Sequence, residues 1–489
     1  MALSTIPQPA VTVAADSTEP PPPAVSPMLR WIVAVAFFMQ MLDGTILNTA
    51  LPGIARDLMV SPLRMQSAVI AYMLTTALFI PASGWIADRF GTKRVFILAI
   101  FLFSLGSLLC ALSQTLEFLV ISRVVQGLGG ALMVPVGRLA VLRAYPRREL
   151  VRVLSFITIP GLVGPLVGPM AGGFLVEYAS WHWIFLINIP VGVLGIILAA
   201  FCMPDIAPGT GWKFDTSGFL LFGASMVLVT FSMEGLGELH LPKVQVTLLC
   251  ALGLMFLGIY WLRALRTEHP LFDPRIFRTR SFAVGICGNL FARLGSGGVP
   301  FLMPLFLQLG LGFSPFFAGA TMIPTALAGI AGKSLITRLV ERIGFRKFLT
   351  ANTAIVGLLI ASFAWVDAAT PYPVLLLHLA VFGTFNSMQF TAMNSVTLVD
   401  LENEHAGSGN SLLSVTMQVS VTCGVAMAAA LLNGFSGAET LATDSPIPIT
   451  IFTRTFLCVG VFTSVTALIF AQVPRDAGRE ARSEYKKDA

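Results

Sequence analysis

Apolar stretches, each about 20 residues long, recur along this chain from residue 31 to residue 472. At about 1.5 Å of rise per residue, a helix of that length crosses a hydrocarbon layer about 30 Å thick. The composition agrees with this, since 55% of the 489 residues are hydrophobic and 11% are charged, whereas soluble domains carry roughly 25% charged residues. A soluble core cannot absorb that much apolar surface. The sequence therefore predicts an all-α integral membrane protein.

Hydropathy, bounded by charges and by Pro and Gly clusters, predicts fourteen spans, at residues 31–51, 67–87, 95–115, 118–142, 151–177, 182–203, 217–234, 244–262, 281–310, 315–337, 348–366, 372–398, 408–434 and 449–472. An even number places both termini on one side. Of the 31 Lys and Arg residues, 24 fall on that side, four fall on the other, and three lie within spans. The positive-inside rule then predicts that both termini are cytoplasmic. The net charge of +6 thus reflects topology, and we expect no nucleic-acid partner.

The two ends of the chain differ in composition from the spans. Residues 1–29 are polar and proline-rich and lack the pattern of a signal peptide, so they are predicted to form a disordered cytoplasmic tail. Residues 474–489 are predicted to form a charged cytoplasmic tail. The six cysteines include no CxxC pair. We therefore expect no metal site, no disulfide and no bound cofactor.

One short loop occurs twice. ADRFGTKRVF at 87–96 and VERIGFRKFL at 340–349 align without gaps at an offset of 253 residues, and they share an acid, an Arg, a Gly and a basic pair. The repeat predicts an N-terminal six-helix half at 30–205, two inserted helices at 206–270 and a C-terminal six-helix half at 271–473. Two related halves around a central site are the architecture of secondary transporters.

Five motifs in order resemble those of the major facilitator superfamily, and within it the fourteen-span drug:proton antiporters. They are LDGTILNTALP at 42–52, GWIADRFGTKR at 84–94, LVISRVVQGLGGA at 119–131, GLVGPLVGPMAGG at 161–173 and WHWIFLINIPVG at 181–192. The resemblance implies the major facilitator fold and a proton-coupled antiporter that exports small organic molecules by alternating access. It also implies a multi-pass protein of the bacterial inner membrane whose partners are protons, a small-molecule substrate and the lipid bilayer. We expect a monomer.

Asp43 is the only acidic residue well inside a predicted span. A carboxylate there costs roughly 2.5 to 3.5 kcal/mol on insertion scales, so it is either neutralised or functional. Burial disfavours the ionised form of a carboxyl group, which allows such a group to hold and release a proton. Helix geometry places Arg123 about 4 to 5 Å from Asp43 in depth, within reach of its side chain. We predict that the two residues couple proton movement, as the resemblance also implies for Arg123; a permanent structural ion pair is the alternative.

Polar side chains of the second half are candidates for a substrate cavity. Arg293 has no acidic residue nearby in its own span, so it should face a wet cavity, polar acceptors or an anionic group of the substrate. Hydrogen bonding between helices is the alternative role for each amide and imidazole. The candidate cavity residues are Arg293, Asn289, Gln308, His378, Asn386 and Gln389.

Two further groups of residues have predicted conformational roles. The repeated loops predict a cytoplasmic gate, in which acidic groups change partners between conformers; its residues are Asp88, Arg89, Arg94, Glu341 and Arg342. The run at 161–173 predicts a hinge and seal between the halves, because small residues let helices approach closely; its residues are Gly164, Pro165, Gly168, Pro169, Gly172 and Gly173.

The substrate is open at this point. The resemblance indicates amphipathic drugs, but three cations, Arg123, Arg293 and Lys333, lie within spans against one acid. That balance also favours an organic anion such as citrate, or a metal–citrate chelate. A channel or a membrane sensor with the same fold is a remote alternative. No deep Ser/His set or HExxH motif is present, so we expect no enzyme.

Overall fold

The computed structural model describes residues 26–205, 214–237, 241–401, 406–440 and 447–477. Most of both predicted tails lies outside these residues. The described chain is helical and contains fourteen helices long and apolar enough to cross a membrane. Each of the fourteen predicted spans coincides with one of them, which confirms the all-α membrane fold. The exact boundaries predicted between the halves and the inserted helices stay a prediction.

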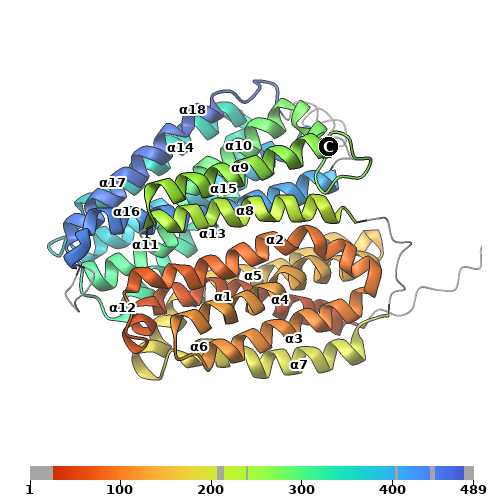
Figure 1. Ribbon diagram of the computed structural model, residues 1–489, viewed down its shortest axis with the longest axis horizontal. Helices are drawn as coiled ribbons and strands as arrows, with labels where there is room; N and C mark the ends of the chain where they lie inside the picture. Colours follow the sequence, from red (N-terminus) through yellow and green to blue (C-terminus); the bar gives the residue numbers. More distant parts are fainter. Residues whose placement is uncertain (1–25, 206–213, 238–240, 402–405, 441–446, 478–489) are drawn as a thin grey trace, which may run out of the picture.

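Six spans come first along the chain and pack together in the lower part of Figure 1. Only Gly91 separates α2 from α3, and two residues separate α4 from α5. The sixth span is divided in two at Ile187. The helices are α1 (Met28–Asp57), α2 (Gln66–Phe90, preceded by the 3-10 turn Pro62–Met65), α3 (Thr92–Ala111), α4 (Leu116–Ala144), α5 (Arg147–Tyr178), α6 (His182–Leu186) and α7 (Asn188–Cys202).

Two helices then form a separate hairpin, α8 (Thr216–Gly237) and α9 (Lys243–Ala264). The last six spans form the upper part of Figure 1. They comprise α10 (Arg280–Ser296), α11 (Val299–Leu305), a π-helical turn Phe306–Gly310, α12 (Pro315–Thr321), α13 (Ile323–Ile343), α14 (Phe345–Ser362), α15 (Tyr372–Leu398), α16 (Ala406–Thr440), α17 (Ile449–Val465) and α18 (Ala467–Phe470).

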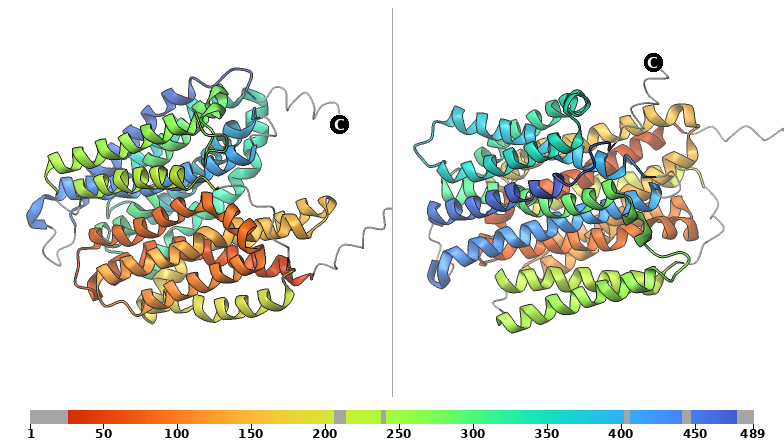
Figure 2. Two further views of the ribbon diagram at one scale, coloured as in Figure 1. Left: turned by 45° about the vertical axis from the view of Figure 1, so that its right-hand side comes forward. Right: turned by 90° about the horizontal axis from the view of Figure 1, so that it is seen from above.

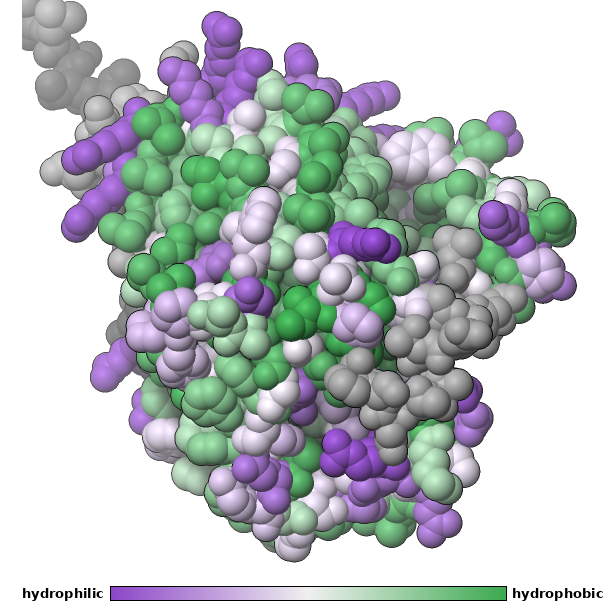
Figure 3. All heavy atoms as spheres, turned by 90° about the vertical axis from the view of Figure 1, so that its left-hand side faces the viewer, coloured by the Kyte–Doolittle hydropathy of each residue, from purple (hydrophilic) through white to green (hydrophobic). Residues whose placement is uncertain are grey.

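The two ends of the bundle are distinguished by their loops. We give the name basic end to the end of the bundle that holds Gly91 between α2 and α3, Pro146 between α4 and α5, and Gly344 between α13 and α14. The other end, with residues 58–61, 112–115 and 311–314, is called the opposite end. Figure 3 faces the opposite end and shows hydrophilic residues scattered among hydrophobic ones. Such a mixture is expected where a membrane protein meets water.

The repeated loops have the same backbone geometry. Gly91 ends α2 with a φ of 87°, and Gly344 ends α13 with a φ of 81°. Only glycine adopts this region without a steric penalty, so the turn requires the glycine that the two sequences share. In each case the next helix starts at the following residue. The repeat therefore encodes one tight turn, used once in each half.

The two halves meet at the opposite end. Gln308 Nε2 donates to the carbonyl oxygen of Thr49 at 2.9 Å, and the backbone N–H of Phe316 donates to Glu177 Oε2 at 2.9 Å. Beside these bonds α12 crosses α5 at backbone contact. This conformer is closed at the opposite end.

The inserted hairpin lies along one flank of the bundle. Figures 1 and 2 show α8 and α9 on the same side, where the first and second halves adjoin. Helix α8 contacts α2 of the first half and α16 of the second. At the basic end Asp215 accepts a bond from Arg263 Nη1 at 2.6 Å, which closes the hairpin. The hairpin therefore covers the seam between α2 and α16.

Candidate functional site

Asp43 and Arg123 form a buried ion pair between α1 and α4. Arg123 Nη1 lies 2.7 Å from Asp43 Oδ2, and each residue is 1% exposed. The contact predicted from depth alone is present in the structure. Breaking a buried pair by removing one partner is strongly unfavourable, since it leaves an uncompensated charge. The two residues must therefore be considered as a unit, while their role in proton coupling stays a prediction.

Neutral polar side chains form hydrogen bonds with both members of the ion pair. Gln126 donates from Nε2 to Asp43 Oδ1 at 2.7 Å and accepts from Arg123 Nη1 at 2.7 Å. Asn188 Nδ2 donates to the same carboxylate oxygen at 3.5 Å, and both amides donate to the Ser107 hydroxyl, at 2.8 Å and 3.2 Å. All five residues are buried. We call Asp43, Arg123, Gln126, Ser107 and Asn188 the Asp43 network.

Sequence reasoning missed three members of this network. Gln126 lies three residues after Arg123 and hence on the same face of α4, a spacing that was available as a signal. Asn188 belongs to the quoted motif at 181–192, but nothing in the sequence relates it to Asp43. Ser107 is one of many hydroxyl residues in spans and carries no distinguishing signal.

A glycine permits the close packing on which the network depends. A Cβ atom on Gly106 would lie 2.5 Å from the Cα atom of Gln126. Because this distance is far below van der Waals contact, α3 approaches α4 only with glycine at this position. The next residue of α3, Ser107, is thereby brought within 2.8 Å of Gln126 Nε2.

Tyr72 of α2 packs its ring against the guanidinium group of Arg123. The guanidinium carbon lies 4.2 Å from the centroid of the tyrosine ring, and Arg123 Nε donates to the Ala68 carbonyl oxygen at 3.4 Å. A cation over an aromatic face gains about 2 kcal/mol or more when both are desolvated. The arginine is thus held by helices α1, α2 and α4 together.

Arg293 occupies a different environment in the second half. It is 4% exposed, its Nε donates to Asn289 Oδ1 at 3.1 Å, and its Nη2 donates to Asn394 Oδ1 at 3.2 Å. Its guanidinium carbon lies 4.0 Å from the centroid of the Phe390 ring. Within the described residues no carboxylate forms an ion pair with it. Two amides and a ring therefore surround a buried cation.

The other candidate cavity residues do not join this cluster. Gln389 pairs with Asn352 and Thr353 between α14 and α15, at 2.8 Å and 2.6 Å. His378 Nε2 lies 2.8 Å from Ser362 Oγ, and Gln308 reaches α1 as described. Asn386 has a buried Oδ1 without a hydrogen-bond partner among the residues that the structure describes. Of the six candidates, the structure brings together only Arg293 and Asn289.

At the basic end Asp88 forms an ion pair with Arg143 of α4, a residue that the sequence did not single out. Arg143 also donates to the Thr92 hydroxyl at 3.1 Å. Arg89, Arg94, Glu341 and Arg342 are exposed. The predicted gate residues are thus placed at one end of the bundle, and the gating role itself stays a prediction.

The glycine- and proline-rich run of α5 has two packing faces. A Cβ atom on Gly164, Gly168 or Gly172 would lie within 2.8 Å of α1 atoms, so this face packs on the helix that carries Asp43. On the second face, a Cβ on Gly173 would lie 2.1 Å from the Pro315 carbonyl oxygen. Reciprocally, a Cβ on Gly319 of α12 would lie 2.1 Å from the Pro169 carbonyl oxygen. The run therefore joins α1 to the other half; Pro165 lies between the two faces.

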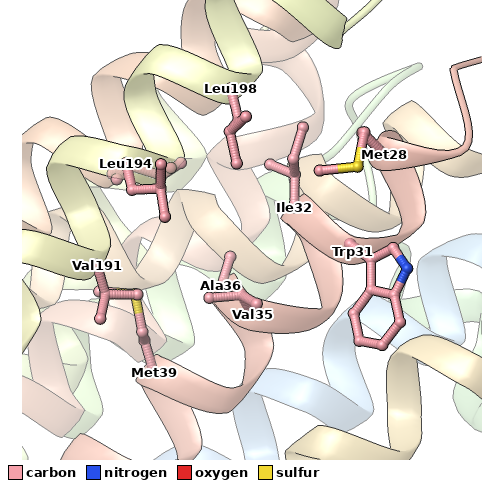
Figure 4. Close-up of a pocket in the computed structure, with 11 residues that line it drawn as sticks. Met28, Trp31, Ile32, Val35, Ala36, Met39, Val191, Leu194 and Leu198 are labelled. Carbon is pink, nitrogen blue, oxygen red and sulfur yellow. The ribbon is translucent and has the colours of Figure 1, made fainter.

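A cavity of about 380 Å³ lies away from these polar groups, between α1 and α7 (Figure 4). Met28, Trp31 and Val35 line it from α1, and Leu194 and Leu198 line it from α7. Trp31 and Leu194 are about half exposed, so the cavity opens on the outer surface of the first half. It does not reach the Asp43 network.

No group of three His, Cys, Asp or Glu side chains suited to a metal ion occurs in the described part of the chain. The six cysteines are free thiols.

Comparison with known proteins defines the family. The model of the Major Facilitator Superfamily matches residues 33–425. The runs FFMQMLDGTILNTALP and ALMVPVGRL suggest a particular resemblance to the "Putative multidrug resistance protein MdtD", and the comparison confirms it. The chain is 48% identical to that protein of Pectobacterium atrosepticum over 451 residues, covering 92% of this chain and 96% of the relative. It is 46% identical to that of Escherichia coli O157:H7 over 457 residues, covering 94% and 97%.

Solved structures with the same fold have little sequence in common with the chain. A D-xylose–proton symporter superposes with a TM-score of 0.61 at 15% identity, covering 92% of this chain and 98% of the symporter. A POT family transporter in complex with 5-aminolevulinic acid gives 0.67 at 15% identity, covering 91% and 95%. Fold, family model and relatives agree: the chain belongs to the Major Facilitator Superfamily.

Proposed function

We propose that the chain is a proton-coupled antiporter of the multidrug-efflux type, which exports small organic molecules by alternating access. The proton gradient supplies the energy, with no cofactor, and the chain carries out transport rather than a chemical conversion. The name of its relatives and the buried Asp43 network support this proposal. One charge that crosses the membrane potential gains roughly 2.3 kcal/mol per 100 mV, enough to drive export against a gradient.

The single observation that carries the proposal is the complete burial of Asp43 against Arg123. In the ionised state Asp43 is held by Arg123 and two amides. A proton on Asp43 removes its negative charge, and the attraction to Arg123 falls. The site therefore has two electrostatic states, and a transporter needs such a group to bind a proton from one side and release it to the other. The conformer closed at the opposite end, with the pair formed, corresponds to the state after proton release.

The orientation follows from charge. The basic end faces the cytoplasm and the opposite end faces the periplasm, with both termini cytoplasmic, as the distribution of Lys and Arg favours. The protein then lies in the bacterial inner membrane and acts as a monomer. In this orientation the present conformer is closed to the periplasm. Asp88 with Arg143 and the exposed Glu341 with Arg342 would form the cytoplasmic gate, whose groups exchange partners when that end closes.

The test is transport by the purified chain in proteoliposomes under an imposed pH gradient, with tetraphenylphosphonium as the cationic probe and citrate as the anionic probe. We expect one probe to accumulate against its gradient, and a protonophore to abolish that accumulation. Accumulation that persists without a proton gradient would contradict proton coupling, and movement of both probes only down their gradients would indicate a channel.

A second candidate substrate is an organic anion, including citrate or a metal–citrate chelate as cargo. The environment of Arg293 favours it, because a buried guanidinium that contacts amides and a ring retains capacity for a carboxylate ligand. A thermal-shift comparison separates the candidates. If the substrate is anionic, citrate raises the melting temperature of the wild type and not that of Arg293→Met, whereas stabilisation by tetraphenylphosphonium in both proteins supports the drug-type substrate.

A further inference from the structure

The cavity between α1 and α7 opens toward the lipid and not toward the polar groups of the candidate site. Its lining consists of apolar side chains and one glycine, and it includes Trp31 of α1, which is 49% exposed, and Leu194 of α7, which is 56% exposed. Figure 4 shows side chains of both helices converging on the space between them. A water molecule in such a space has no polar partner. Hydrocarbon is therefore the medium that suits this cavity.

The cavity has the length of one lipid leaflet. Along α1 it extends from Met28, the first residue of the helix, to Met39. These residues are eleven positions apart, which is about 16 Å along the axis, and half of the hydrocarbon layer is about 15 Å thick. Because α1 begins at the basic end, the cavity runs from that face of the membrane to its middle. An acyl chain from the leaflet at the basic end matches this length.

A cation lies beside the outer end of the cavity. The ring of Phe156 on α5 contacts the Trp31 ring edge-on at a centroid distance of 4.7 Å, and the Arg30 guanidinium carbon lies 5.3 Å from the centroid of the same ring. Among the described residues no carboxylate forms an ion pair with Arg30. Tryptophan is enriched at the level of the lipid headgroups, and arginine there attracts anionic lipids.

The start of α5 adds positive charge to the same region. Arg152 is exposed and precedes Phe156 by four residues, so it lies on the same face of α5, one turn nearer the basic end. Residues 147–152 read RRELVR, and Asp205 follows α7. Together with Arg30, these segments carry four arginines against two acidic residues. That balance favours an anionic headgroup over a zwitterionic one.

We propose that the cavity between α1 and α7 binds one acyl chain of an anionic glycerophospholipid, whose phosphate contacts Arg30 at the basic end. The chain lies against α1, the helix that also carries Asp43, and Arg152 adds to the potential that holds the headgroup. An amphipathic cation is disfavoured at this place because the arginines repel it. A compact anion such as citrate has no apolar part to fill the cavity. The inference goes beyond the proposed transport and does not depend on it.

The test uses Trp31 as the reporter and needs no transport. The full-length chain is reconstituted in phosphatidylcholine vesicles, in which a rising fraction of the lipid is replaced by dibrominated phosphatidylglycerol or, in a parallel series, by dibrominated phosphatidylcholine. Bromine on an acyl chain quenches tryptophan fluorescence on contact, and the difference between the wild type and Trp31→Phe gives the Trp31 signal. We expect half-quenching of this signal at about a fivefold lower fraction of phosphatidylglycerol, since one arginine near the membrane surface contributes about that factor.

Trp183 provides the matched control, because it is 53% exposed on α6 at the opposite end. The difference between the wild type and Trp183→Phe should show no preference between the two lipids. Quenching of Trp183 that is the same in every variant also shows that the variants insert and fold. Arg30→Gln should remove the preference at Trp31.

Gly195→Leu tests the cavity itself. A Cβ atom on Gly195 would meet only Ile100, at 3.6 Å, which is ordinary contact, so a leucine side chain can be added to the lining. It should reduce quenching of Trp31 by both lipids. Equal quenching of Trp31 by the two lipids in the wild type, a preference that survives Arg30→Gln, or unchanged quenching in Gly195→Leu overturns the proposal. Relief of the quenching by tetraphenylphosphonium also overturns it, because the occupant would then be cargo and not lipid.

Discussion

The two halves bury charge in opposite ways. In the first half, Asp43 and Arg123 neutralise each other inside a set of hydrogen bonds that involves four helices. In the second half, Arg293 keeps its charge among two amides and a phenyl ring. The pair can change its net charge by binding one proton, whereas the lone guanidinium stays charged and can only change its ligand. Under the proposed function, we therefore expect proton exchange in the first half, and contact with the anionic group of a substrate, if it has one, in the second.

The largest effect is expected from Asp43→Asn. An amide cannot carry a proton, so proton-driven accumulation of the transported probe in proteoliposomes should fall on the order of 100-fold or more. The control is Asp367→Asn, which removes a carboxylate from an exposed loop at the opposite end and should transport normally. Coupled transport at the wild-type rate by Asp43→Asn would end the distinction between the halves.

Arg123→Met tests the pair as a structural unit. Removal of the partner leaves a buried carboxylate uncompensated, so the free energy of unfolding should fall by about 3 to 5 kcal/mol. Thermal unfolding in detergent measures this loss. Adding Asp43→Asn should restore much of the stability, because the stranded charge is gone. Equal losses in the single and double variants would show that the two charges do not interact.

Gln126→Met removes the amide that bonds both charges. Hydrogen bonds to charged groups contribute about 1.5 to 3 kcal/mol each, so the free energy of unfolding should fall by roughly that amount. The equivalent change in the second half, Asn289→Met, loses bonds to Arg293, Thr397 and the Gly285 carbonyl oxygen; only one of them involves a charged group, so it should cost less. Unfolding of the two variants side by side measures the difference, and the reverse order would contradict it.

Arg293→Met should have the smallest effect on stability. The change loses two hydrogen bonds to neutral amides but also removes the cost of holding an unpaired charge in the interior, so we expect a change in the free energy of unfolding below about 1 kcal/mol, measured as for Arg123→Met. A loss as large as that of Arg123→Met would mean that Arg293 has a structural partner as strong as Asp43.

Some parts of the fold and of the candidate site could be predicted from the sequence, and others could not. The spans could be predicted, because crossing hydrocarbon demands about 20 apolar residues. The contact of Asp43 with Arg123 could be predicted as well, since both are charged and lie at similar depth. Gln126, Ser107 and Asn188 could not be assigned with the same arguments, because many neutral polar side chains occur in the spans and the cost of burying each is smaller than that of a charge. The direction in which a side chain points around its helix also decided the outcome for Gln389 and His378, which bond to α14 and not to Arg293.

The inserted hairpin makes the two lipid-facing flanks of the molecule different from each other. Because α8 contacts both α2 and α16, the seam on that flank is covered, and Gly223 of α8 packs directly on Leu78 of α2. The other seam, where α5 meets α12 and α13, has no inserted helix in front of it among the described elements. An amphiphile dissolved in the bilayer therefore meets two different flanks, one covered by α8 and one that the described elements leave without an inserted helix.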